Sequence, residues 1–317
     1  MEVKPSFLKL GSRGSPLALT QSRLVAAMLA KGGDVSAFPI ESFVTSGDRI
    51  QGRLQEAGGK GLFTKELDEA LLDGRIDAAI HSMKDLPTRM PDGIVLAAVP
   101  AREDPRDGFI ALRAKTLMDL RQGATVGTAS LRRQAQTLHL RPDLKVEMLR
   151  GRVETRLARI ESGAFDATYL ALAGLKRLGL EGHAASIVDS EAMPPAPGQG
   201  ALAITARAGD EKTLALLVPL NIAEHAITTT AERAFLQALD GSCRTPIAAL
   251  ASIADGKLAF LGEVLTPDGR HCWRRRETVN LGGDPSGTAR DLGLRLGAEI
   301  KAEAGPLYTA HFGDRGW

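Results

Sequence analysis

The sequence has few of the features that define several common protein classes. Only two of its 317 residues are cysteines, Cys243 and Cys272, and their spacing matches neither a CxxC motif nor a metal site. This usage predicts a reducing, cytoplasmic setting without a disulfide framework. No apolar run approaches the roughly 18 residues needed to cross a bilayer. The first residues also lack the apolar core of a secretory signal, so we expect neither a membrane protein nor a secreted one.

Net charge is also small, but its composition is uneven. The chain has 40 Lys and Arg against 38 Asp and Glu, a formal net charge of +2, which argues against binding nucleic acid through overall charge. Arginine nevertheless outnumbers lysine by 28 to 12. Arginine suits bidentate recognition of carboxylates and phosphates, although GC-rich codon usage produces the same excess. Clustering of the arginines at motif positions would favour anion recognition over codon usage.

Alternating strands and helices predict an α/β architecture over the first two thirds of the chain. Its length suggests two or three domains. The expected strands cover 7–10, 40–45, 76–80, 94–99, 125–127, 146–149, 167–172 and 201–206. The expected helices cover 15–30, 64–72, 131–139, 153–162 and 210–217. This alternation favours mostly parallel sheets, and a likeness between 11–15 and 127–130 suggests two related lobes.

The last third of the chain has a different order. The Pro- and Gly-rich segment 193–200 is the strongest breaker in the sequence. Beyond it we expect a helix over 229–239, consecutive strands over 247–253, 258–264 and 273–279, and an amphipathic helix over 288–302. This order predicts a smaller α+β unit of about 95 residues.

Two expected strand-to-helix junctions are rich in small hydroxylated residues: Ser12, Gly14 and Ser15 in the first, Thr128 and Ser130 in the second. Free backbone N–H groups at a helix N-terminus favour anions. Arg13, Arg132 and Arg133 lie at these junctions, where the helix dipole opposes a cation. Ordinary capping with solvated arginines explains one junction equally well. Two such junctions together favour an anionic ligand.

The second lobe carries the main cationic excess. From 121 to 177 there are nine Arg and two Lys against five acidic residues, a local excess of +6. Arg150, Arg152, Arg156 and Arg177 lie near expected strand ends or helix starts, where open α/β sheets bind ligands. Several arginines there predict a ligand with multiple carboxylates or phosphates. No GxxxxGK[ST] or GxGxxG motif occurs at these positions, so a nucleotide is not indicated.

The segment His81-Ser82-Met83-Lys84-Asp85 ends an apolar strand. Asp85 is a candidate general acid or electrostatic stabiliser, with the Lys84 cation beside it. Taken alone, an aspartate after a strand is more often a turn former. His81 alone is more readily explained as a structural histidine.

Cys243 lies in a tight loop, Asp240-Gly241-Ser242-Cys243-Arg244-Thr245-Pro246. Arg244 beside it would lower the pKa of the thiol, which makes Cys243 a candidate nucleophile or covalent attachment point. The alternative is a small buried residue. Cys272 falls within an expected strand, and we assign it no role.

These motifs occur together in one known family. The chain resembles the hydroxymethylbilane synthase family, also called porphobilinogen deaminase. The resemblance rests on GSRGSPLALTQ (11–21), VTSGD (44–48), GGKGLFTKELDEALL (58–72), DAAIHSMKDLPT (77–88), EDPRD (103–107), VGTASLRRQAQ (126–136), LRGRVETRL (149–157), LALAGLKRLG (170–179), PAPGQGAL (195–202), AERAFLQALDGSC (231–243) and TPIAA (245–249). Beyond about residue 250 it rests only on length and the order of strands and helices.

The resemblance implies two lobes like those of periplasmic binding proteins, with mixed, mostly parallel sheets, plus a smaller α+β C-terminal domain. The implied domains are 1–101 with 199–220, 102–198, and 221–317. The implied reaction joins four porphobilinogen molecules head to tail with release of ammonia, after which water releases linear hydroxymethylbilane for tetrapyrrole and heme biosynthesis. A dipyrromethane cofactor would be thioether-linked to Cys243 as primer. A cytoplasmic monomer is implied, with no metal, nucleic acid or membrane.

The resemblance also implies the site residues. Asp85 would be catalytic: it would hold the pyrrole N–H groups and stabilise the cationic azafulvene that forms when ammonia leaves. The implied cofactor contacts are Cys243, Lys84, Ser82, Arg132, Arg133, Thr128, Ser130 and Asp85. The implied substrate contacts are Arg13, Ser15, Arg150, Arg156 and Arg177. Arg152 stands where the family usually has asparagine, and it is left out of the site.

Two other functions fit parts of the sequence. A non-catalytic, two-lobed binder of a polycarboxylate would need the lobes and the arginines, but it leaves Cys243 unexplained. A cysteine-dependent hydrolase would use Cys243 as nucleophile with a histidine as base. The chain has only six histidines, and none pairs with Cys243 by a recognisable motif.

Overall fold

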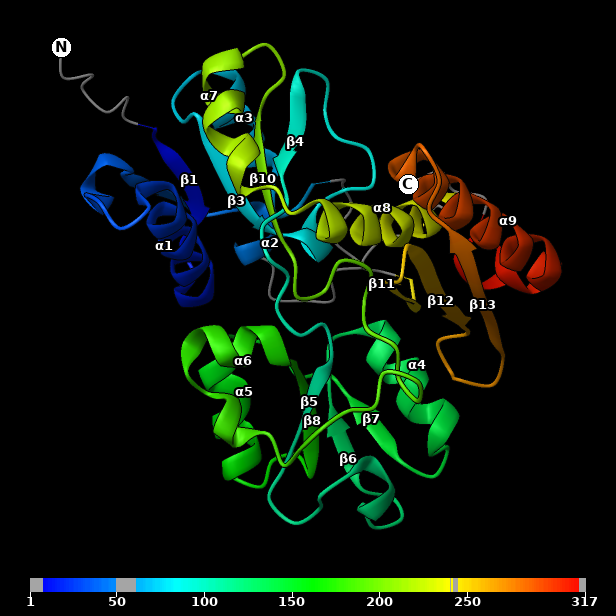
Figure 1. Cartoon of the computed structure of the whole chain (residues 1–317). Coiled ribbons are helices and arrows are strands. Elements are labelled where there is room, and N and C mark those ends of the chain that lie inside the picture. Colours follow the sequence, from blue (N-terminus) through cyan, green and yellow to red (C-terminus); the bar gives the residue numbers. More distant parts are fainter. Residues whose placement is uncertain (1–7, 50–60, 240, 242–244, 314–317) are drawn as a thin grey trace, which may run out of the picture. The chain divides into compact units, whose positions relative to one another are not determined.

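The computed structural model describes residues 8–49, 61–239, 241 and 245–313, which divide into two compact units (Figure 1). Unit 1 takes the chain up to Arg102 together with Ala201–Ala226, and unit 2 takes Glu103–Gly200 together with the chain from Ile227 onward. Cys243, the proposed attachment residue, lies outside the described residues.

Unit 1 is built on a five-stranded sheet with the order β2-β1-β3-β10-β4. Its strands are β1 (Leu10–Arg13), β2 (Ile40–Phe43), β3 (Ala78–Ser82), β4 (Ile94–Ala98) and β10 (Leu202–Arg207). Its α-helices are α1 (Pro16–Ala30), α2 (Ser46–Arg49), α3 (Lys65–Leu72), α7 (Glu211–Leu217) and the start of α8 (Ala223–Ala238). Strand β1 pairs in parallel with β2 and β3, whereas β10 runs antiparallel to β3 and β4.

Local chemistry explains where these elements begin. Ser15 caps α1 by accepting a hydrogen bond from the Ala18 N–H, and Pro16 occupies the first helical position, where no backbone donor is needed. Strand β3 is buried on both faces up to His81, as expected for a central strand between helical layers. The expected elements of this unit are present, with their bounds shifted by a few residues.

Unit 2 contains a second five-stranded sheet with the order β7-β6-β8-β5-β9. Its strands are β5 (Asp107–Ala111), β6 (Thr125–Gly127), β7 (Lys145–Glu147), β8 (Ala167–Ala171) and β9 (Ser186–Ile187). Its helices are α4 (Leu131–Leu140), α5 (Val153–Glu161) and α6 (Leu172–Leu178). Strand β6 pairs in parallel with β7 and β8, and β5 runs antiparallel to β8 and β9. The same strand pattern recurs in both sheets, which confirms the two related α/β lobes.

The rest of unit 2 is an antiparallel three-stranded sheet with two long helices. Strands β11 (Ile247–Ala254), β12 (Lys257–Leu265) and β13 (Cys272–Asn280) pair in chain order. Helices α8 and α9 (Pro285–Phe312) pack on this sheet around a core that includes Phe235 and Phe260, whose ring centroids are 5.3 Å apart. This is the expected α+β arrangement, so the predicted fold class is confirmed.

Three sequence expectations need correction. Strand β5 was not predicted, because Asp107 follows a polar stretch that resembles a linker. Helix α8 begins at Ala223 rather than near 229, because a run of three β-branched threonines weakens the helical signal while Thr228 and Thr229 are buried by tertiary packing. The last helix continues well past residue 302, through a kink at Gly305.

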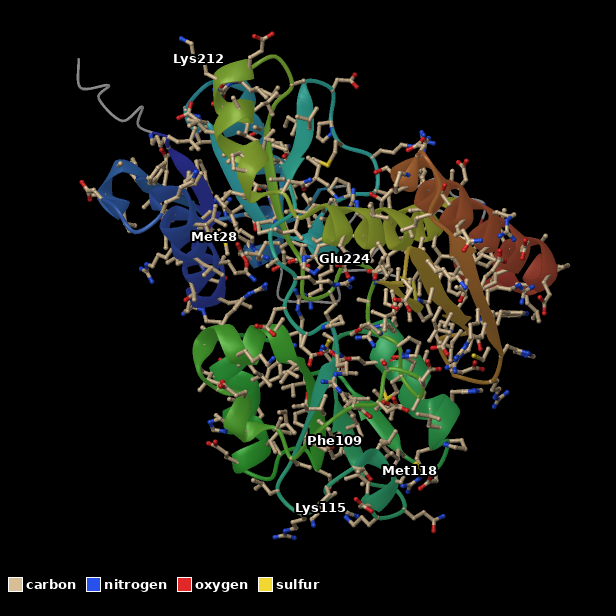
Figure 2. The ribbon with its side chains drawn as sticks, in the orientation of Figure 1. Met28, Phe109, Lys115, Met118, Lys212 and Glu224 are labelled. Carbon is tan, nitrogen blue, oxygen red and sulfur yellow. The ribbon has the colours of Figure 1, made fainter. Side chains whose placement is uncertain are left out.

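Figure 2 labels residues both of the core and of the surface. Phe109 is 1% exposed inside the core of the second sheet, whereas Met118 lies at the surface.

Among the described residues no single helix is long and apolar enough to span a membrane. Only the bent pair Glu211–Leu220 and Ala223–Ala238 meets that test jointly, by length and composition alone.

Candidate functional site

Arg13 and Asp85 come together at one edge of the unit 1 sheet. Strands β1 and β3 are parallel neighbours, so Arg13 at the end of β1 and the segment after Ser82 emerge at the same edge. The 3₁₀ helix η2 (Met83–Asp85) follows β3 directly and carries Lys84 and Asp85. Arg13 Nη1 lies 3.5 Å from Asp85 Oδ2. The structure therefore joins two of the predicted site residues as an ion pair.

Arg13 has further partners that fix its guanidinium. It pairs with Asp48, and its Cζ lies 4.3 Å from the centroid of the Phe63 ring. Burial alone would lower the pKa of Arg13, but the hydrogen bond to Asp48 and the charges of Asp85 and Asp48 raise it. The Asp85 side chain remains 29% exposed, which leaves its carboxylate accessible to a ligand.

The two residues of β3 that precede η2, His81 and Ser82, have hydrogen-bond partners on neighbouring elements. Ser82 Oγ accepts a hydrogen bond from Gln21 Nε2 at 3.0 Å. The buried His81 ring lies 3.1 Å from Thr205 Oγ1 on β10, and burial, aided by the charge of Arg13, lowers the pKa of His81 to about 4. His81 is thus a neutral, structural histidine, as expected, and not a proton carrier near pH 7.

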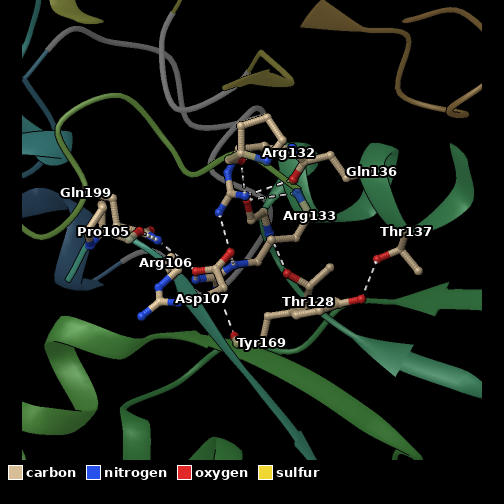
Figure 3. A network of polar contacts seen from close by, with 12 residues as sticks. Pro105, Arg106, Asp107, Thr128, Arg132, Arg133, Gln136, Thr137, Tyr169 and Gln199 are labelled. Carbon is tan, nitrogen blue, oxygen red and sulfur yellow. Dashed lines mark hydrogen bonds and ion pairs between the residues drawn. The ribbon is translucent and has the colours of Figure 1, made fainter. Parts of the chain in front are cut away.

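A buried network in unit 2 centres on Asp107, at the start of β5 (Figure 3). Arg133 donates to it from Nη2 at 2.7 Å and from Nε at 3.1 Å, and Arg132 Nη2 donates at 2.8 Å. Gln199 Nε2 adds a fourth donor at 2.8 Å. Burial alone would raise the pKa of Asp107, but the charges of Arg133 and Arg132 lower it far below its usual range. The carboxylate is therefore ionised in the folded protein.

This network differs from the expected picture of open arginine anchors. Arg132 and Arg133 are only 4% and 6% exposed, and Asp107 engages both. Arg132 Nη1 also donates to Gln136 Oε1 and to the Pro194 carbonyl, and Arg133 Nη1 donates to the Tyr169 carbonyl. Two cations nevertheless share one carboxylate, and the buried Arg132 Nε has no partner among the described residues. The charge of Glu263 acts on Arg132 as well, so both arginines are held by contacts within unit 2.

The second junction forms a helix cap next to this network. Ser130 Oγ accepts from the Arg133 N–H at 3.4 Å, and the Ser130 N–H donates to Thr128 Oγ1 at 3.1 Å. At both junctions, then, a serine caps the following helix, Ser15 for α1 and Ser130 for α4. The capping explanation and the ligand explanation are compatible, because a cap leaves other N–H groups of the first turn available.

The other arginines of unit 2 form a group of like charges. Burial, together with the charges of Arg133 and Arg150, lowers the pKa of Arg156 to about 10. Arg156 Nε donates to the Gly151 carbonyl at 2.9 Å. Arg177 Nη2 donates to the Gly200 carbonyl at 2.7 Å, and burial lowers its pKa despite the opposing charge of Glu103. An anion beside Arg156 would oppose this lowering of its pKa, of which burial is the largest cause.

The sequence alone did not predict a role in the site for Asp107, Gln199 or Asp48. Asp107 and Gln199 lie inside two of the segments that carry the resemblance, EDPRD and PAPGQGAL, but no spacing marks them as partners of Arg132 and Arg133. Their role depends on contacts across many residues of chain, which a linear pattern does not carry.

Cys272 is the one free cysteine in the described part of the chain. Its Sγ lies 3.7 Å from Glu263 Oε2, and burial followed by the charge of Glu263 raises the pKa of the thiol to about 12. Such a thiol is a poor nucleophile, consistent with the absence of any assigned role. Within the described ranges no group of three or more His, Cys, Asp or Glu side chains is arranged to hold a metal ion.

Two protein-family descriptions match this chain, one over its first two thirds and one over its last third. Residues 8–215 match the family described as "Porphobilinogen deaminase, dipyromethane cofactor binding domain", and residues 226–302 match "Porphobilinogen deaminase, C-terminal domain". A porphobilinogen deaminase from Phenylobacterium zucineum is 50% identical, over 96% of this chain and 98% of its own. One from Caulobacter sp. is 53% identical, over 94% and 96%.

The fold also overlaps in part with solved substrate-binding proteins. A putative methionine-binding lipoprotein from Bacillus subtilis is 16% identical with a TM-score of 0.41, over 69% of this chain and 92% of that chain. A periplasmic substrate-binding protein of an ABC transporter from Coxiella burnetii is 18% identical with a TM-score of 0.42, over 67% and 91%.

Proposed function

The chain belongs to the porphobilinogen deaminase family, and we propose which of its residues carry out that family's reaction. The protein is a transferase of tetrapyrrole biosynthesis. It joins four porphobilinogen molecules into linear hydroxymethylbilane, releases ammonia at each addition and uses a dipyrromethane cofactor. Because the chain belongs to an enzyme family, the alternative of a non-catalytic polycarboxylate binder no longer applies.

Asp85 is the catalytic carboxylate. As the C–N bond of the substrate's aminomethyl group breaks, ammonia leaves with the bonding electron pair and the remaining methylene–pyrrole becomes cationic. A carboxylate nearby stabilises that charge. The exposed fraction of Asp85 and its position at the edge of the sheet support this role. Arg13, 3.5 Å from Asp85 Oδ2, orients the carboxylate and binds a substrate carboxylate.

The same carboxylate accepts the proton released during coupling. A C–C bond forms when the next pyrrole ring attacks the cationic methylene carbon through its free α-carbon. That α-carbon then loses its proton, and the aromatic ring is restored. Asp85 is the group that takes this proton, and it returns the proton to solvent or to the next leaving amine. Lys84 and Ser82, one and three residues before Asp85 in the sequence, bind carboxylate groups beside it.

The described residues fit a polycarboxylate cofactor. The cofactor, when bound, supplies the primer onto which the substrate units are added. Arg132, Arg133, Thr128 and Ser130 would hold its acetate and propionate groups, and Asp85 its pyrrole N–H groups. The sharing of the Asp107 carboxylate by two arginines supports this assignment. Cys243 would bind the cofactor covalently through a thioether.

Arg13, Ser15, Arg150, Arg156 and Arg177 bind the carboxylates of porphobilinogen and of the growing chain. The observation that supports this proposal is the position of the half-buried Arg156 beside the charges of Arg133 and Arg150, a group of like charges that an anion would stabilise. Arg152, exposed at the start of α5, stays outside the set.

The proposed setting is a cytoplasmic monomer with three domains, in which unit 2 comprises the second lobe and the α+β domain. The sparse cysteines support a reducing compartment. Light scattering of the purified protein tests the monomer, which a mass of twice 33.6 kDa would contradict.

Intact-mass analysis of the purified protein tests the attachment residue. We expect a covalent adduct that gives the colour reaction of a dipyrrole, and peptide mapping should assign it to Cys243. Cys243→Ser should abolish the adduct, and the matched control Cys272→Ser should retain it. An adduct that survives Cys243→Ser, or active enzyme with an unmodified Cys243, would remove Cys243 from this role.

A further inference from the structure

Glu263 is a buried carboxylate on β12, in the α+β part of unit 2. Its side chain is only 1% exposed, and glutamate is rarely buried unless it is paired. Oε2 accepts a hydrogen bond from Arg274 Nε at 2.9 Å and another from Arg274 Nη2, from the residue paired with it on β13. Oε1 accepts from Gln136 Nε2 at 2.8 Å. The carboxylate therefore links the α+β part of unit 2 to helix α4 of the second lobe.

Gln136 lies one helical turn after Arg132, so the two side chains share a face of α4. Its Oε1 accepts from Arg132 Nη1 at 2.8 Å (Figure 3). Its Nε2 donates to the Pro194 carbonyl at 2.9 Å as well as to Glu263. An amide group that turned over would exchange its donor and its acceptor. Because two acceptors lie on the Nε2 side, Gln136 has one favourable orientation, in which Oε1 faces the guanidinium of Arg132.

The charges around Arg132 favour the same arrangement. Arg132 and Arg133 share the carboxylate of Asp107, so two positive charges face one negative charge there. Burial lowers the pKa of Arg132, and the charges of Asp107 and Glu263 oppose this lowering. Arg132 is thus held on two sides, with Nη2 on Asp107 and Nη1 on Gln136.

Other contacts between α4 and the turn that joins β12 to β13 do not involve Arg132. Gln134 Nε2 donates to the Pro267 carbonyl at 3.2 Å, and His139 Nδ1 lies 2.8 Å from the Gly269 carbonyl oxygen. Gln134 and Gln136 are the same residue type in the same helix, and each donates to the α+β part of unit 2. Gln134 is therefore a matched control for Gln136.

We propose that Glu263 is a positioning residue for Arg132 and that it acts through Gln136. The α+β domain thereby fixes the guanidinium that would bind a carboxylate of the cofactor in the second lobe. Hydrogen bonds from behind a binding residue lock its side-chain conformation in this way. Without them Arg132 keeps Asp107 but loses its fixed orientation, and its contact with a cofactor carboxylate weakens. This inference rests on the proposed role of Arg132 in cofactor binding.

The test uses the full chain with and without its cofactor. Each protein is produced in ordinary cells and in cells that cannot make porphobilinogen, and intact mass verifies which form carries the adduct. The thermal midpoint of both forms is measured, and the increase in midpoint on loading is compared between variants. Contacts to the cofactor that exist only in the folded protein produce this increase. A variant that only loosens packing lowers both midpoints alike and leaves the increase unchanged.

We expect Gln136→Leu to reduce the increase in midpoint on loading by about 3 °C or more, because a charge-assisted hydrogen bond of Arg132 is weakened. Glu263→Gln should reduce it by a smaller amount, because its amide keeps the shape of the side chain but presents a donor to Gln136 or to Arg274. The control Gln134→Leu should leave the increase within about 1 °C of wild type.

A double variant tests whether the effect passes through Arg132. Arg132→Met should itself reduce the increase on loading, and adding Gln136→Leu to it should cause little further loss. Effects that pass through one shared residue are not additive, whereas independent effects are. A further loss as large as that of Gln136→Leu alone would therefore contradict the proposed route.

Two other results would overturn the inference. One is a wild-type increase on loading in Gln136→Leu or in Glu263→Gln, and the second of these variants decides if the first fails to fold. The other is an equal loss in Gln134→Leu and Gln136→Leu, which would reduce the pair to general docking of α4. A wild-type increase in Arg132→Met would instead refute the proposed role of Arg132, so the two failures are distinguishable.

Discussion

The side-chain amide of Gln199 donates a 2.8 Å hydrogen bond to the buried carboxylate of Asp107. The same amide donates to the Pro105 carbonyl at 2.7 Å. The two chain segments that adjoin the boundaries of unit 2, near 103 and near 200, are therefore bonded to each other within that unit. Because Asp107 also holds Arg132 and Arg133, these two segments and the proposed cofactor-binding arginines share one carboxylate.

Asp107→Asn should strongly destabilise unit 2. The substitution leaves two buried guanidinium groups without their counter-ion, and loss of one partner of a buried ion pair costs about 3–5 kcal/mol. The free energy of unfolding in urea is the measurement. Glu303→Gln, which removes an exposed partner of Arg275, is the matched control and should cost about 0.5 kcal/mol or less. Equal losses in the two variants would contradict the central role of Asp107.

Stability should fall on mild acidification because of His81. Its folded-state pKa of about 4 lies below the ordinary value of 6.5, so the unfolded chain binds the extra proton between those pH values. The neutral His81 ring therefore contributes to the free energy of unfolding above about pH 6.5. This contribution is lost as the pH falls toward 4. The full effect is about 3 kcal/mol.

The experiment compares wild type with His81→Gln between pH 4.5 and 7.5. Asp68 titrates in the same range with the opposite sign, because burial raises the pKa of that carboxyl to about 6. Only the difference between the two proteins isolates His81. Glutamine retains a polar partner for Thr205 but does not titrate, so the difference should shrink as the pH falls. A difference that is independent of pH would contradict the neutral, buried histidine.

Most of the fold follows from local patterns, whereas the network around Asp107 does not. Capping serines, apolar strands and the breaker at 193–200 predict most elements near their observed places, although α2, α6 and β9 were not predicted. Strand β5 escapes prediction because it begins with a charged residue after a polar stretch. Asp107 pairs with residues 25, 26 and 92 positions away, and no motif records such contacts.

The same limit applies to the candidate site. Strand ends indicated Asp85 and Arg13 because parallel neighbours bring their carboxyl ends to one edge of a sheet. The burial of Arg132 and Arg133 was not foreseen, because two arginines in the first turn of a helix usually point to solvent. Their actual environment depends on Asp107, whose position requires the folded chain.

Asp85→Asn should reduce kcat by about 10²–10⁴ while the thermal midpoint changes little. The amide keeps the size of the side chain and still accepts a hydrogen bond from Arg13, but it neither opposes the cationic methylene–pyrrole nor takes a proton. Steady-state turnover of porphobilinogen and a thermal scan are the measurements. Turnover within about threefold of wild type would remove Asp85 from the catalytic role.

Arg156→Gln should weaken the use of porphobilinogen at low substrate concentration. Arg156 lies beside the charges of Arg133 and Arg150, and burial, together with these charges, lowers its pKa. Loss of one charge-assisted hydrogen bond to a substrate carboxylate should lower kcat/KM about tenfold or more.

Arg159→Gln is the matched control, because Arg159 lies in the same helix, α5, with an exposed side chain. Its kcat/KM should stay within about twofold of wild type, and the loss in Arg156→Gln should diminish at high salt as screening weakens the carboxylate contact. Equal kcat/KM values for the two variants would show that Arg156 serves the helix and not the substrate.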